Sequence, residues 1–83
     1  MVNKLIEVLK DSLEVYVAVQ SGGVRMESTI SVESVSYENG TLTFGELGNS
    51  VHITEVSNFS IKEDDNDWWL QYQDQLINIY PYF

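Results

Sequence analysis

The spacing of apolar residues along the chain changes once, near residue 13. Before that point apolar side chains recur every three to four positions, as they do along one side of a helix. The members of this stripe are Val2, Leu5, Ile6, Leu9 and Leu13. Asn3 belongs to a residue type favoured at helix N-caps. The pattern therefore predicts one helix, over residues 3 to 13, with this stripe packed on a sheet.

After residue 13 apolar and polar residues alternate, which is typical of strands with one buried face. Val15, Val17 and Val19 open the series. In the next run the residues expected on one face are Val24, Met26, Ser28, Ile30 and Val32. A break in the alternation near Glu33 and Ser34 is expected to bring Val35 and Tyr37 back to the inner face, the one that is turned toward the core. Further strands are predicted around residues 41–44, 51–54, 59–61, 68–73 and 76–80.

Turn signals separate these runs. Asn39-Gly40 between two alternating segments predicts a type I′ hairpin, since both central residues of that turn need positive φ. Ser21-Gly22-Gly23 predicts another reversal, and residues 45–49 are loop-like in composition. We also expect turns at the acidic residues near 65 and at Asp74-Gln75. Pro81, which lacks an N–H, should end its strand or lie on an edge.

These elements predict an α+β fold that is mostly β. We expect residues 1–83 to form a single domain, in which an N-terminal helix packs on a small antiparallel sheet or partly open barrel of five to seven short strands. Hydrophobic residues make up 43% of the chain, which is enough for a globular core despite its charge.

Charge narrows the function classes. Thirteen acidic residues and four basic ones give a formal net charge of −9. Nucleic acid, anionic membranes and anionic cofactors should be repelled. Glu7 and Lys10 interrupt the apolar stretch near the N-terminus, and no apolar run approaches the ~20 residues that span a bilayer. We therefore expect a soluble, cytoplasmic protein without disulfides, since cysteine is absent.

The acidic residues cluster beside two tryptophans. The predicted partner-binding residues are Glu63, Asp64, Asp65, Asp67, Trp68 and Trp69. Adjacent rings in a strand point to opposite faces, so one tryptophan is expected in the core and the other in an interface. Two other interpretations stay open, namely a solvated hairpin tip that protects strand edges and a site for a divalent cation.

No catalytic, metal or cofactor site is assigned. An EF-hand loop needs a central glycine and a glutamate at its twelfth position, whereas the twelfth position from Asp64 is Gln75. His52 is the single histidine, and Thr54 and Glu55 beside it form no recognised catalytic arrangement. The sequence does not predict an enzyme.

The function expected from these features is that of a non-catalytic acidic protein-binding module. It would inhibit a partner by occluding a basic, nucleic-acid-binding surface, as the nucleic-acid mimics among phage anti-defence proteins do. It would bind neither nucleic acid nor membrane itself. The alternatives are a structural, self-assembling subunit of a homo-oligomer and a small-ligand-binding barrel.

Overall fold

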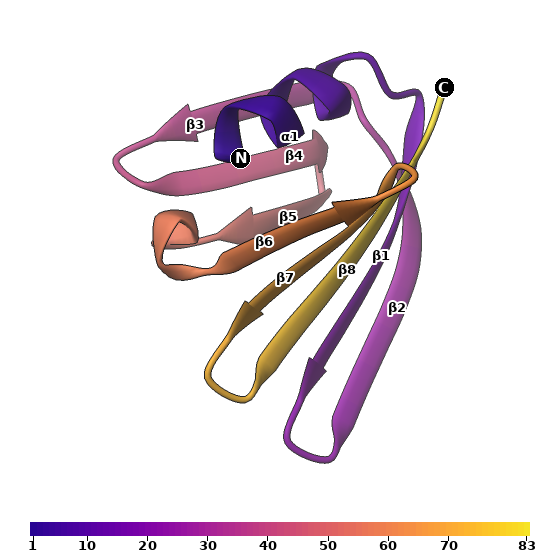
Figure 1. Cartoon of the computed structure of the whole chain (residues 1–83). Coiled ribbons are helices and arrows are strands. Elements are labelled where there is room, and N and C mark those ends of the chain that lie inside the picture. The colour runs from indigo at the N-terminus through magenta and orange to yellow at the C-terminus, as the bar shows by residue number, and fades with distance from the viewer.

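The computed structural model describes residues 1–83 and contains one α-helix, eight strands and one short 3-10 helix (Figure 1). The elements are α1 (Val2–Lys10), β1 (Glu14–Ser21), β2 (Val24–Ser31), β3 (Ser34–Glu38), β4 (Thr41–Glu46), β5 (Asn49–Ile53), η1 (Val56–Asn58), β6 (Ser60–Asp64), β7 (Asp67–Tyr72) and β8 (Gln75–Tyr82). The predicted class, α+β and mostly β, is confirmed.

All strand pairs are antiparallel, and they form two open sheets instead of one. The larger sheet has the order β2-β1-β8-β7-β6, and the smaller one has the order β3-β4-β5. There are thus eight strands where five to seven were expected. The predicted break near residue 33 is the point where the chain leaves the larger sheet for the smaller one. No helix is long and apolar enough to cross a membrane.

α1 packs against β3 of the smaller sheet and buries Leu5 and Leu9 completely. The predicted helix ended three residues too late, since α1 ends at Lys10 and Leu13 is 71% exposed. The Leu13 N–H donates to the carbonyl of Tyr82 at 2.9 Å, so this residue already runs beside β8. The stripe therefore stops one turn early.

The N-terminal end of α1 also differs from the expectation. Met1 occupies the N-cap, and its carbonyl accepts from the Leu5 N–H at 3.1 Å. Asn3 lies within the helix, so the predicted N-cap was wrong. No side chain caps this end.

The Asn39-Gly40 hairpin is confirmed. Asn39 has φ 53° and Gly40 has φ 78°, and they join β3 to β4. The reversal at residues 21–23 is confirmed too, with Gly22 at φ 58°.

The predicted Asp74-Gln75 turn was wrong by one residue. Gln73, with φ 55°, and Asp74 form the turn, and Gln75 begins β8.

Residues 45–49 are not a continuous loop. Gly45 lies inside β4, and only Leu47 and Gly48 separate β4 from β5. A Cβ on Gly45 would lie 2.5 Å from the carbonyl oxygen of Asn49 and 2.7 Å from the Cα of Ser50. This close approach across the β4–β5 hairpin explains a glycine in mid-strand.

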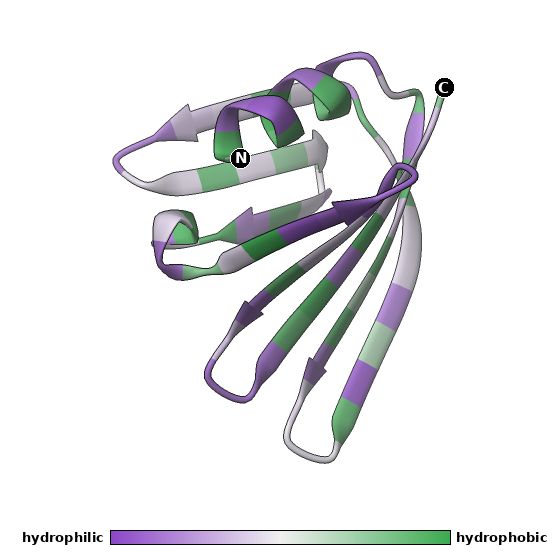
Figure 2. Ribbon diagram, viewed as in Figure 1, coloured by the Kyte–Doolittle hydropathy of each residue, from purple (hydrophilic) through white to green (hydrophobic).

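The core lies between the two sheets, beneath α1. Its largest members are Trp68, Phe44, Leu5, Leu9, Leu42 and Leu70. Burial alternates along β8, as it does in a strand with one buried face, and Figure 2 shows hydrophobic and hydrophilic residues alternating along the first part of β2. Pro81 lies in β8 beyond the part paired with β7, where its missing N–H interrupts no bond to that strand.

The smaller sheet covers only part of the larger one. Ile30 in β2 is buried, but Val24 and Met26 on the same face are 63% and 70% exposed. Figure 1 shows why, since the β1–β2 and β7–β8 hairpins extend beyond the smaller sheet. These residues share one face, as predicted, but nothing covers that face at Val24 and Met26. Tyr37, also expected on the inner face, is exposed as well.

Candidate functional site

The predicted partner-binding residues lie at the end of the β6–β7 hairpin, on both faces of the sheet. Glu63 pairs with Trp68 across the hairpin, and Asp64 pairs with Asp67. Directly paired residues share one face, and neighbours along a strand point to opposite faces. The six residues are therefore split between an inner face, an outer face and the turn.

Two of the six belong to the inner face. Trp68 is 1% exposed and lies in the core, with the Lys4 ammonium 6.0 Å from the centre of its ring. Glu63 accepts a hydrogen bond from the Asn66 backbone N–H at 2.9 Å and from Lys4 at 3.1 Å. These bonds, the first above all, hold the pKa of Glu63 below its usual value.

Glu63 and Trp68 therefore join α1 to the hairpin. Trp68 is thus the core ring of the predicted pair, and its side chain cannot reach a partner. Trp69 is the exposed ring of the two, at 37%. The Trp68 indole N–H is buried and has no hydrogen-bond acceptor.

The remaining acids form what we call the acidic corner, which consists of Asp64, Asp65 and Asp67. Asp65 and Asn66, with φ 52° and 68°, are the central residues of the turn. Figure 2 shows this hairpin end as a hydrophilic tip. Asp64 and Asp67 lie on the outer face of the larger sheet, on the same side as Trp69. The structure thus brings three of the predicted acids and one predicted ring together.

Internal hydrogen bonds fix the geometry of the corner. Asp67 Oδ1 accepts from Asn78 Nδ2 at 2.6 Å, and Asn78 also donates to the Trp68 carbonyl at 2.9 Å. Asn66 Nδ2 donates to the Pro81 carbonyl at 3.3 Å. Sequence reasoning missed Asn78, whose only signal is a polar residue at an outward position between two buried isoleucines.

Exposed aromatic rings continue the outer face from Trp69. Tyr80 and Tyr82 point outward from β8, and their ring centres are 5.4 Å apart. Tyr16 on β1 is paired with Tyr80. We call Trp69, Tyr80 and Tyr82 the outer aromatic face. The alternation along the sequence could have placed these rings together, but only once β8 was known to lie beside β7.

No residue of the acidic corner takes part in an ion pair, although Lys62 lies on the same face, directly opposite Trp69. The two ion pairs of the structure are Lys4–Glu63 and Arg25–Glu27, and neither involves Asp64, Asp65 or Asp67. No group of three or more histidine, cysteine, aspartate or glutamate side chains is arranged to hold a metal ion. The corner therefore presents negative charge to its surroundings beside apolar rings.

His52 lies away from this surface, on β5. Its ring nitrogens are 3.1 Å from Thr43 Oγ1 and 3.1 Å from Ser50 Oγ. It points away from its apolar neighbours, as predicted, but its partners are not the sequence neighbours Thr54 and Glu55. Because both partners are hydroxyl groups, no carboxylate orients the ring as in a catalytic triad.

Comparisons with protein-family models, with curated proteins and with solved structures give no match for this chain. The site is therefore interpreted from its own geometry.

Proposed function

We propose that this protein is a non-catalytic module that binds a basic surface of a partner protein. The observation that supports this most is the acidic corner, three aspartates without a basic partner, next to the outer aromatic face. The unpaired charges of such a corner cost the folded protein stability, because like charges on one surface repel one another. A partner that supplies the missing cations would relieve this repulsion.

The two parts of the surface have different physical roles. The net charge of −9 accelerates encounter with a basic surface and disfavours acidic ones. Trp69 and the two tyrosines provide rigid apolar area, which slows dissociation once a complex forms. Fixed carboxylates beside aromatic rings suit a two-step association. The carboxylates first attract the basic partner, and the rings then pack against it and exclude water from the interface.

Within this class, we favour a partner whose basic surface binds nucleic acid. Such surfaces are the main concentrations of positive charge on proteins inside cells, so we also place the encounter in the cytoplasm. Occupation of that surface by the acidic corner would block nucleic acid and inhibit the partner. Anti-defence proteins of phages, which act in this way, are the model for this part of the proposal.

The test is a lysate pull-down with wild type and two matched triple variants. One carries Asp64→Asn, Asp65→Asn and Asp67→Asn. The control carries Asp11→Asn, Glu38→Gln and Asp74→Asn, which removes the same charge at exposed positions elsewhere. We expect wild type and the control variant to retain a basic partner protein at low salt, and the corner variant to lose this partner. Added duplex DNA should release the partner from wild type.

Two results would contradict the proposal. Capture that is indifferent to both salt and the corner variant would exclude electrostatic recognition. Recovery of this protein alone, together with a large oligomer in native mass spectrometry, would favour the self-assembling alternative, in which exposed strand edges pair between copies.

A further inference from the structure

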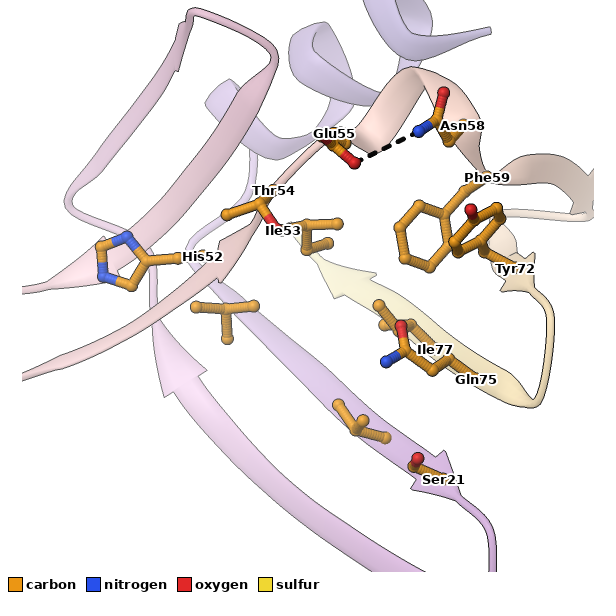
Figure 3. Close-up of a pocket in the computed structure, with 12 residues that line it drawn as sticks. Ser21, His52, Ile53, Thr54, Glu55, Asn58, Phe59, Tyr72, Gln75 and Ile77 are labelled. Carbon is orange, nitrogen blue, oxygen red and sulfur yellow. Dashed lines mark hydrogen bonds between the residues drawn. The ribbon is translucent and has the colours of Figure 1, made fainter.

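A cleft opens between the two sheets, on the side where the larger sheet extends beyond the smaller one. It has a volume of about 440 Å³ and is lined by β1, β5, η1, β7 and β8 (Figure 3). Its apolar lining consists of Val19, Val51, Ile53, Phe59, Tyr72 and Ile77. Sites for small molecules are typically about 300–1,000 Å³ and mostly apolar. The cleft therefore has the size of a small-molecule site, and half of its 12 lining residues are hydrophobic.

The charge of the cleft favours a cationic ligand over an anionic one. Glu55 contributes the one carboxylate of the lining, and no lysine or arginine is present there. Its Oε2 accepts from Asn58 Nδ2 at 3.3 Å, and it takes part in no ion pair. An anionic ligand would meet this carboxylate and the excess negative charge of the chain. A cation would be attracted by both.

The backbone holds Glu55 in an unusual conformation. It has φ 51°, and the other non-glycine residues with positive φ, Asn39, Asp65, Asn66 and Gln73, all lie in two-residue hairpin turns. Glu55 instead precedes η1, where this conformation directs the chain from β5 around the edge of the cleft. Asn58 at the other end of η1 then meets its carboxylate (Figure 3).

An aromatic pair stands beside this carboxylate. The ring centres of Phe59 and Tyr72 are 5.6 Å apart, and their planes are tilted by 50°. Figure 3 shows both rings at the side of the cleft next to η1. Aromatic faces attract organic cations through the ring quadrupole. A carboxylate, two rings and an aliphatic floor are the groups that recognise an ammonium ion with an apolar body.

We propose that this cleft binds a small organic cation, an amine whose hydrocarbon or aromatic body lies on Val19, Ile53 and Ile77. The ammonium group is held between Glu55 and the Phe59–Tyr72 pair. The site lies apart from the acidic corner, so this proposal does not depend on the partner proposed above.

The test uses three ligands of one shape: 4-phenylbutylamine, 4-phenylbutanol and 4-phenylbutyrate, each titrated into ¹⁵N-labelled protein and followed by NMR. We expect saturable shifts at residues of the cleft, with affinity falling from the amine to the alcohol to the carboxylate. Glu55→Gln should weaken the amine about five-fold and leave the alcohol unchanged, as expected for a partly exposed ion pair. Glu38→Gln, which removes the same charge on an exposed strand, is the control.

Tyr72→Leu keeps apolar bulk and removes a ring, so it should weaken the amine more than the alcohol. The spectrum of each variant without ligand shows whether the fold is intact. Equal affinity for amine and carboxylate, shifts confined to the outer aromatic face, or no saturable binding at all would each overturn the proposal.

Discussion

Asp64 and Asp67 lie directly opposite each other at the end of the β6–β7 hairpin, and neither forms an ion pair. Like charges opposed across two strands destabilise a hairpin by up to about 1 kcal/mol. We therefore expect Asp64→Asn to raise the melting temperature at low salt, with the gain shrinking at high salt as screening removes the repulsion. Asp64 is the better choice, because Asp67 is hydrogen-bonded to Asn78.

The control for this prediction is Asp74→Asn. Asp74 occupies the turn of the next hairpin and is exposed, so this change removes the same net charge without an opposing acid. If both variants gain equally, general charge repulsion and not the Asp64–Asp67 pair is responsible. A variant that is more stable but binds its partner less well would show that the corner is maintained for binding.

A second prediction concerns pH. The pKa of Glu63 is lowered by the Asn66 N–H and by Lys4, so the folded state favours the ionised carboxylate. A carboxylate with a lowered pKa stabilises the fold above its unfolded pKa of about 4.3, and this contribution disappears as pH falls through the folded pKa. Glu63→Gln should therefore melt lower than wild type at pH 7. The difference should close in acid, measured by circular dichroism, and a difference independent of pH would contradict the assignment.

The fold class and most turns could be predicted because they depend on local pattern. Asn39-Gly40 is one case, since few other residue pairs tolerate two positive φ values. The turn at Gln73 was misplaced because glutamine has no preference for positive φ and Asp74 beside it does. The existence of a second sheet could not be predicted, because its strands have the same period as those of the first.

The burial of individual positions depended on long-range contacts. Met26 and Ile30 share one face of β2, yet only Ile30 lies under the smaller sheet. For the candidate site, alternation correctly predicted that the two tryptophan rings point apart. It could not show that Glu63 would turn inward to Lys4, a residue 59 positions away along the chain.

A third prediction tests the close approach at Gly45. Its φ of 134° and the backbone 2.5 Å from an added Cβ leave no room for alanine. We expect Gly45→Ala to destabilise the protein by more than about 2 kcal/mol. Gly23→Ala, at a turn position with open space and no positive φ, should change stability little. Chemical denaturation of both variants makes the comparison, and similar losses would argue against the β4–β5 geometry.

The last prediction separates the buried part of the N-terminal stripe from its exposed end. Leu9 is fully buried on the inner side of α1, whereas Leu13, beyond the end of this helix, is 71% exposed. Leu9→Asp places an unpaired charge in the core, at a cost of about 4 kcal/mol or more, which approaches the whole stability of a domain of this size. We expect this variant to be unfolded by circular dichroism. Leu13→Asp should fold and melt close to wild type, although the period-3.6 pattern places both residues on one stripe. If Leu13→Asp unfolds the protein and Leu9→Asp does not, α1 continues past Lys10, and Leu13 instead of Leu9 is buried in the core.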